Sequence, residues 1–327
     1  MINQKKVLAL TTTLTHTRKL YQRVLRLMGN RFELSVVADA SEADWAEAKL
    51  DAAIAEIQRI EALLTTYRPD SQTNQINEAA GLHPVKVDRE VFDLINRSIR
   101  ISELTQGAFD LSYGSIDKRL WNFDTQLDAL PDPKTAKRMV RLINYRNIML
   151  DESAQTVMLK EAGMRIGFGG IGKGYAAEMA RRFLKASGVE SGVVNAAGDL
   201  TVWGNQPNGQ LWTIGIAHPD FKDWPFSSLT IADMAVATSG NYEKFVRING
   251  KKYSHTIDPH TGYPVHGIKS VTIICPNAEL ADAMATPVMV MGIEAGLYLI
   301  NQMHHIGCII IDESNRLYHS KNIKIHS

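Results

Sequence analysis

The stretch that decides the fold is Gly167-Phe168-Gly169-Gly170-Ile171-Gly172-Lys173-Gly174. It lies between strand-like segments near 156–160 and 191–195, and it opens a helix predicted over 173–187. The spacing G-x-G-x-x-G of a dinucleotide-binding loop is present, but that fold also needs an acidic residue at the end of the next strand. Glu190 comes before that strand and Asp199 follows a further glycine turn, so the match to a dinucleotide-binding sheet is poor.

The same stretch nearly spells a Walker A loop, in which Gly-Lys is followed by Ser or Thr. Gly174 stands where that hydroxyl should hold magnesium, so this interpretation fails on its chemistry. Glycines let a ligand approach the backbone closely, and the N–H groups and positive dipole of a helix N-terminus suit phosphate. We therefore favour a phosphate contact, with Lys173 adding a charge, over a tight turn that leaves Lys173 in solvent.

The segments around this stretch mix helices and strands without strict alternation. Helical periodicity predicts helices over 42–64, 88–104 and 279–303, and a short basic helix within 131–146, whose charges fit a solvated face better than an anionic partner. Strands are predicted near 32–36, 211–217, 229–237, 244–257 and 268–275, with a closing hairpin. This pattern indicates an α+β fold with mixed, largely antiparallel sheets and packed helices. We expect one domain over 20–320, or two closely packed lobes, after an N-terminal extension over 1–19.

Composition excludes several classes of protein. The 327 residues carry 36 Lys and Arg against 35 Asp and Glu, and a net charge of +1 gives no field to hold nucleic acid. The two cysteines, Cys275 and Cys308, rule out a disulfide framework and a multi-cysteine metal site. We see no transmembrane segment, no secretory signal and no cysteine placed to take a lipid, so we expect a cytoplasmic protein.

A possible base and a carboxylate stand three residues apart in His255-Thr256-Ile257-Asp258, just before a turn marked by Pro and Gly. Histidine titrates near neutrality, so His255 could accept the proton of a hydroxyl group. The alternative, which spacing alone favours, is an ordinary turn in which Asp258 bonds its own backbone. His260 and His266 show no sign of a functional role.

A carboxylate and a hydroxyl share one face of the predicted C-terminal helix, because Asp282 and Thr286 are four residues apart. Magnesium takes few protein oxygens and completes its shell with water and phosphate, so this pair suits magnesium better than calcium. The alternative is that Asp282 only balances the helix dipole and Thr286 only packs.

Taken in order, these segments resemble the ApbE-type FAD:protein FMN transferases. The similarity runs from Met28 to Gly292 and is far more specific than any single motif. The resembling stretches are Met28-Gly29, Thr66 to Ser71 with Asn77, Thr105 to Asp110, Leu120 to Phe123, Gly169 to Tyr175, Asn195 to Asp199, Thr238 to Tyr242, His255 to Pro264 and Asp282 to Thr286.

The resemblance implies where FAD and Mg²⁺ bind. FAD would lie extended along the site, contacted by the residues Met28, Tyr67, Ala108, Phe109 and Asp110, with Lys173 near the cofactor. Mg²⁺ would be bound by Asp282, Thr286 and a backbone carbonyl of the glycine loop, which we place at Gly170. This ligand set agrees with the sparse oxygen pair inferred above from the residues themselves.

The resemblance also implies the reaction. A Thr or Ser hydroxyl of an acceptor protein attacks the FMN-side phosphorus of FAD, which leaves a phosphoester-linked flavin and releases AMP. His255, with Asp258 as the other candidate, would take the proton of the hydroxyl. The implied acceptors are subunits of membrane redox complexes or flavin-carrying reductases.

Two other functions remain open at the level of sequence. Water could replace the acceptor hydroxyl, which would give a Mg²⁺-dependent FAD pyrophosphatase, or the chain could be a flavin-binding protein without turnover. The second alternative rests on two departures from the family pattern: Gly167 where relatives often carry an acidic residue, and Ala197 where a Gly is common. If position 197 requires a positive φ angle, Ala197 should be strained there.

Overall fold

The computed structural model describes residues 17–116, 131–217, 225–240, 245–248, 251–254 and 256–323. Its main element is a sheet of eight strands in the order β1-β2-β6-β7-β10-β13-β14-β15, and neighbouring strands in it run antiparallel. The strands are β1 (Arg18–Leu27), β2 (Asn30–Asp39), β6 (Gly192–Ala196), β7 (Asp199–Trp203), β10 (Met234–Gly240), β13 (Ile268–Cys275), β14 (Gly307–Asp312) and β15 (Leu317–His319). The predicted α+β class with largely antiparallel sheet is confirmed.

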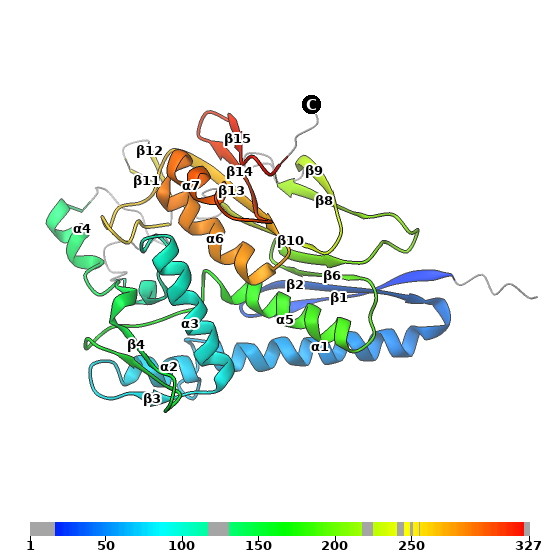
Figure 1. The fold of residues 1–327 in the computed structure, drawn as a ribbon, viewed down its shortest axis with the longest axis horizontal. Helices are drawn as coiled ribbons and strands as arrows, with labels where there is room; N and C mark the ends of the chain where they lie inside the picture. The colour runs from blue at the N-terminus through cyan, green and yellow to red at the C-terminus, as the bar shows by residue number, and fades with distance from the viewer. Residues whose placement is uncertain are drawn as a thin grey trace, which may run out of the picture.

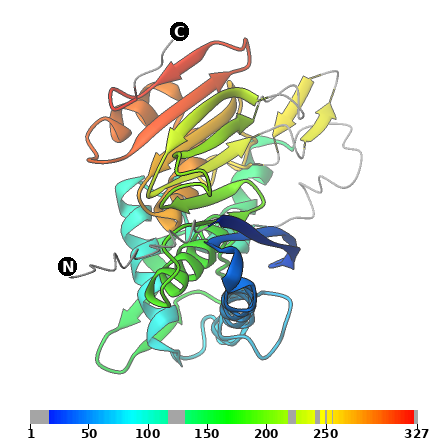
Figure 2. The same cartoon turned by 90° about the vertical axis from the view of Figure 1, so that its right-hand side faces the viewer.

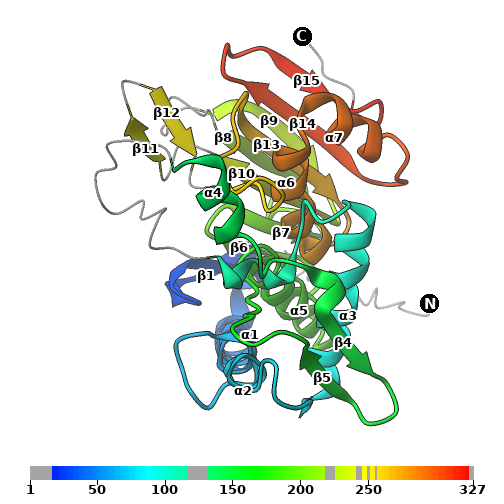
Figure 3. The ribbon, with the colours of Figure 1, turned by 90° about the vertical axis from the view of Figure 1, so that its left-hand side faces the viewer.

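Helices cover one face of this sheet, and a hairpin covers part of the other. On the helical face lie α1 (Ala43–Leu64), α3 (Arg89–Leu104), α5 (Gly172–Ala186), α6 (Ala278–Met291) and α7 (Ile293–Ile300) (Figures 1 and 3). The opposite face packs against β8 (Trp212–Ala217) and β9 (Pro225–Ile231). Alternation along the strands produces the two layers, since Val36 belongs to the core under the helices and Val37 to the core under the hairpin.

A smaller sheet lies at the end of the molecule away from β15 (Figures 1 and 3). It has the order β3-β5-β4. Its strands are β3 (Val85–Lys86), β4 (Ile148–Asp151) and β5 (Thr156–Leu159), and α2 (Gln72–Glu78) lies nearby. The remaining elements are α4 (Pro133–Met139) and the hairpin of β11 (Phe245–Ile248) and β12 (Lys251–Ser254), which stands apart from the large sheet (Figure 2).

Several predicted elements match the structure closely, and others need correction. The helices predicted over 42–64, 88–104 and 173–187 are α1, α3 and α5. The helix predicted over 279–303 is broken into α6 and α7, because Gly292 takes a φ of +85° that cannot continue a helix. The stretch 229–237 holds the end of β9 and most of β10, and 244–257 holds the hairpin of β11 and β12.

The glycine stretch does not sit in a parallel unit. The strands on either side of it, β5 and β6, belong to different sheets. A dinucleotide-binding fold would require them to be parallel strands of one sheet. The structure therefore agrees with the poor match of the sequence to that fold. Within the part of the chain that the structure describes, no helix is long and apolar enough to cross a bilayer.

Two tight turns lie next to each other at the same end of strands in the main sheet. Met28-Gly29 joins β1 to β2, and Ala197-Gly198 joins β6 to β7; all four residues have positive φ angles. Two-residue hairpins favour this conformation because its twist matches that of the strands. The turns are neighbours because β2 pairs with β6, with the Ala197 amide donating to the Arg31 carbonyl over 2.9 Å.

Candidate functional site

A cluster of one ammonium and two carboxylates lies beside these turns. Lys173, in the first turn of α5, places its Nζ 2.8 Å from Oδ2 of Asp199, the first residue of β7. The same Nζ lies 3.4 Å from Oδ1 of Asp282 on α6. Both carboxylates are also held by backbone amides: Asp199 accepts from the Thr238 amide over 3.2 Å, and Asp282 from the Gly174 amide over 2.8 Å.

Burial and proximity set the charges of this cluster. Burial raises the pKa of Asp199 to about 6, and the neighbouring carboxylate of Asp282 adds to the rise. Burial alone would lower the pKa of Lys173, but the carboxylates of Asp282 and Asp199 outweigh it and raise that pKa. Lys173 therefore stays charged, while two carboxylates share it. A further cation beside Asp282 would relieve their repulsion.

Thr286 completes the pair predicted on α6. It lies one helical turn beyond Asp282, and its side chain is partly exposed. Its Oγ1 is 2.8 Å from Oγ of Ser239, near the end of β10. The expectation that Asp282 and Thr286 share a helix face is thus met. Among the residues that the structure describes, no group of three or more His, Cys, Asp or Glu side chains is arranged to hold a metal ion.

The structure explains why position 174 is a glycine, which the sequence did not reveal. A Cβ atom at this position would lie 2.2 Å from the Ala278 carbonyl oxygen and 2.5 Å from Cβ of Asp282. The backbones of α5 and α6 therefore approach so closely that only glycine fits, and this approach lets the Gly174 amide reach Asp282. Part of the helix N-terminus predicted to bind phosphate is thus used to hold a carboxylate.

Three segments that are distant in the sequence converge on the glycine loop. A Cβ added to Gly170 would lie 3.6 Å from the Phe109 ring, and one added to Gly172 would lie 3.5 Å from Cε of Met28. A Cβ on Gly167 would lie 3.9 Å from Thr66, so a larger side chain has room there. Met28, Phe109 and the segment that contains Tyr67 are therefore neighbours of one loop.

The residues predicted to contact the flavin differ in exposure and in whether their side chains already have hydrogen-bond partners. Tyr67 is 95% exposed, which leaves its ring available to a ligand. Phe109 is buried against the glycine loop. Asp110 accepts bonds from the backbone amides of Ser112 and Tyr145, each over 2.8 Å, so its carboxylate helps to hold the local fold. Burial raises the pKa of Asp110.

Asp258 lies in a turn of the kind that the sequence offered as the alternative to catalysis. Its carboxylate accepts from the His260 amide over 2.8 Å and from the Thr261 hydroxyl over 2.9 Å. His260 in turn places Nε2 2.9 Å from the Gln106 carbonyl oxygen. The turn is therefore tied to the loop that carries Ala108, a role of His260 that spacing did not reveal. His255 lies outside the described residues.

A groove of about 400 Å³ lies next to this turn. Its lining includes Ala108, Asp258 and His260, together with Met291 and Tyr298 of the C-terminal helices. Its lining therefore includes two residues, Ala108 and Asp258, that the sequence assigned to the site.

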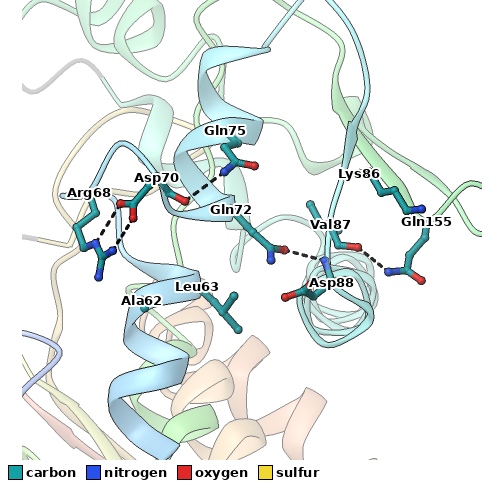
Figure 4. A pocket seen from close by; sticks show the side chains of 10 residues that line it. All are labelled: Ala62, Leu63, Arg68, Asp70, Gln72, Gln75, Lys86, Val87, Asp88 and Gln155. Atoms are coloured by element: carbon teal, nitrogen blue, oxygen red, sulfur yellow. Dashed lines mark hydrogen bonds and ion pairs between the residues drawn. The ribbon is translucent and has the colours of Figure 1, made fainter. Parts of the chain in front are cut away.

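A separate pocket of about 520 Å³ involves the segment after Tyr67 (Figure 4). Arg68 is paired with Asp70, whose carbonyl accepts from Gln75, and Gln72 accepts from the Asp88 amide (Figure 4). These groups bond one another, and none of the residues around Lys173 lines this pocket. The candidate site is therefore the region around Lys173, Asp282 and the glycine loop.

Comparison with known proteins assigns a family to this fold and site. The model of the ApbE family matches residues 28–310. A protein from Klebsiella pneumoniae named FAD:protein FMN transferase is 35% identical over 79% of this chain and 80% of its own length. A protein of the same name from Treponema pallidum is 30% identical over 93% of this chain and 87% of its own.

A solved structure agrees. The crystal structure of the ApbE protein from Thermotoga maritima superposes with a TM-score of 0.81 at 28% identity, and covers 93% of this chain and 97% of that one. Fold and site thus define an α+β protein whose relatives are named as transferase enzymes. The chain belongs to the ApbE family.

Proposed function

We propose that this enzyme transfers FMN from FAD to a Thr or Ser hydroxyl of an acceptor protein and releases AMP. The observation that carries the proposal is the placement of Asp282 beside Lys173, with Thr286 one helical turn further along α6, at the loop on which Met28 and Phe109 converge. Relatives of 35% and 30% identity bear the name of this activity. Membership of the family supports the same conclusion.

The donor set around Asp282 fits Mg²⁺. It offers one carboxylate and one hydroxyl on a helix face, next to a second buried carboxylate whose pKa is raised to about 6. Asp282, Thr286 and the carbonyl of Gly170 would hold the ion. Once bound, Mg²⁺ would neutralise charge on the pyrophosphate of FAD, which phosphoryl transfer requires.

The residues around the glycine loop would hold the substrate. Met28 and Tyr67 supply apolar and aromatic surface, Phe109 is buried against the glycine loop, and Ala108 and Asp110 are its neighbours in the sequence. Lys173 supplies positive charge at the start of α5, where a pyrophosphate would also meet the helix dipole. Together these groups would fix FAD with its phosphates near Asp282.

The proposed reaction is a single displacement at phosphorus. The acceptor hydroxyl oxygen forms a bond to the FMN-side phosphorus, the bond from that phosphorus to the bridging oxygen breaks, and AMP leaves with that oxygen. The proton of the hydroxyl passes to His255 as base, with Asp258 as the alternative. Three bonds tie the Asp258 carboxylate to the amide and ring of His260 and to Thr261, which favours His255.

The test is an incubation of the full chain with FAD, Mg²⁺ and a Thr-containing domain from a flavin-carrying reductase, followed by intact-mass analysis and AMP measurement. A gain of one FMN on the domain, matched by AMP and abolished by EDTA, is the expected result. AMP without any gain in mass, repeated over several acceptor domains, would establish the pyrophosphatase instead. If neither AMP nor modified acceptor formed with several acceptor domains, both enzymatic functions would be refuted, and flavin binding without turnover would be the function left.

A further inference from the structure

Among the residues that the structure describes, the side chain of Ser239 lies within hydrogen-bond distance of the Thr286 hydroxyl. The two oxygens, Ser239 Oγ and Thr286 Oγ1, lie 2.8 Å apart, and either could donate. Ser239 follows Ala235 and Ala237 at two-residue spacing on β10, and both alanines belong to the core beneath the helices. Ser239 therefore faces α6, the helix that carries Asp282 and Thr286.

A hydroxyl that binds a cation must turn a lone pair toward it. Its O–H then points away from the cation and needs an acceptor, because an unmade hydrogen bond in a partly buried place is costly. Ser239 Oγ lies where it can accept a hydrogen bond from the Thr286 hydroxyl. We propose that Ser239 is a positioning residue that orients the Thr286 hydroxyl for a divalent cation; this rests on the metal site of the proposed function.

The neighbouring residue, Thr238, ties the same end of β10 to the ion pair of Asp199 and Lys173. The Thr238 amide donates to Oδ1 of Asp199, whose Oδ2 pairs with Lys173. Two adjacent residues near the end of β10 therefore contact Asp199 and Thr286, respectively. Residues that hydrogen-bond to metal ligands orient those ligands, and their loss typically weakens metal binding by about 10–100-fold.

The strand also supplies a matched control. Thr238 points to the opposite face from Ser239, and its Oγ1 lies 2.9 Å from Oγ1 of Thr272 on β13. Thr272→Val removes the hydrogen bond between Thr272 and Thr238 of β10, which is nearly as short as the one between Ser239 and Thr286. It leaves the Ser239–Thr286 pair unchanged. Ser239→Thr keeps a hydroxyl at the position and should preserve binding.

The experiment is a titration of the metal-free full chain with Mn²⁺, followed by EPR, with and without FAD. Wild type, Ser239→Thr and Thr272→Val should bind with similar affinity, whereas Ser239→Ala should bind about 10–100-fold more weakly. Circular dichroism melting of each variant reports on its folding.

Each other outcome overturns the inference in a recognisable way. If wild type and Ser239→Ala bind equally, Ser239 does not orient a ligand. If Ser239→Ala and Thr272→Val weaken binding alike, the effect comes from general loosening of β10. If wild type binds no Mn²⁺ even with FAD, the metal site of the proposed function is absent, and the role of Ser239 falls with it.

Discussion

The ammonium of Lys173 lies 2.8 Å from the carboxylate of Asp199, at the N-terminal end of α5. The dipole of a helix disfavours a cation at this end, so the lysine depends on the nearby carboxylates to stay there. Asp199 directly follows the tight turn Ala197-Gly198, and Asp282, the second partner, lies on α6. The charged groups of the site therefore come from three elements: Lys173 from the start of α5, Asp199 from the start of β7, and Asp282 from α6.

Asp282→Asn should abolish metal binding and FMN transfer. The change removes the proposed carboxylate ligand, and because loss of an outer partner alone costs about 10–100-fold, we expect transfer to fall by more than about 100-fold. The measurement is the initial rate of AMP release with an acceptor. Glu279→Gln is the control: Glu279 lies on the same helix but pairs with Arg97 over 2.6 Å. Equal losses in both variants would argue against a specific role of Asp282.

The raised pKa of Asp199 predicts a pH-dependent cost in stability. The carboxyl titrates near 6 in the folded chain instead of 3.8, so the folded chain holds more protons than the unfolded one between these values. Stability due to Asp199 is thus present below about 4 and lost as the pH rises through 6. The free energy of unfolding of wild type relative to Asp199→Asn, measured by urea in EDTA, should fall over this window. A flat or rising difference would contradict it.

Gly174→Ala should destabilise the fold by about 1–3 kcal/mol or more, because its Cβ would lie 2.2 Å from the Ala278 carbonyl oxygen. It should also separate Asp282 from the Gly174 amide and weaken transfer. Urea unfolding measures the first effect. Gly169→Ala is the matched control, since a Cβ there meets nothing within 4 Å and its φ angle is not positive. Equal stability of the two variants would refute close packing as the reason for Gly174.

Ala197→Gly should stabilise the chain. Ala197 has a φ of +57°, a left-handed conformation that costs an L-residue about 1–2 kcal/mol, so the strain expected from the sequence is present. Replacement by glycine should recover about 1 kcal/mol, less the entropy that glycine loses on folding. Gly198→Ala, at a φ of +100°, should destabilise. Thermal melting compares them, and a lower melting temperature for Ala197→Gly would contradict the prediction.

His255→Ala should keep FAD binding and lose transfer, because the proposed role of His255 is to take a proton and not to hold the flavin. FAD fluorescence quenching measures the first property and acceptor modification the second. Asp258→Asn removes the negative charge of the turn and one of the two oxygens that accept from His260 and Thr261, and it should retain more activity than His255→Ala. Unchanged turnover in His255→Ala would remove it from the mechanism.

The sequence predicted elements where one physical signal dominated. The period of the buried residues defined α1 and α3, and the buried run of β13 was placed at its observed ends. The pairing of strands is set by long-range contacts, so nothing local showed that β5 and β6 lie in different sheets. The break at Gly292 was missed because the apolar pattern continues through it.

Individual residues of the site could be predicted from the sequence, but the contacts between them could not. The spacing of Asp282 and Thr286 predicted their shared helix face. Strain at Ala197 was predicted only if the position had a positive φ angle, and the structure shows that it does. Asp199 and Ser239 lay in stretches that resemble the family, but their partners are 26 and 47 residues away in the sequence. Such contacts follow from the tertiary fold and leave no local pattern.

The central claim is that this chain moves FMN onto a protein hydroxyl. The most direct test is tandem mass spectrometry of an acceptor domain with one exposed Thr, incubated with the wild-type chain, FAD and Mg²⁺, beside the same domain carrying Val at that Thr. We predict one FMN linked through phosphate to that Thr and none on the Val domain. AMP formed at the same rate with both domains, and no flavin on either, would contradict the claim.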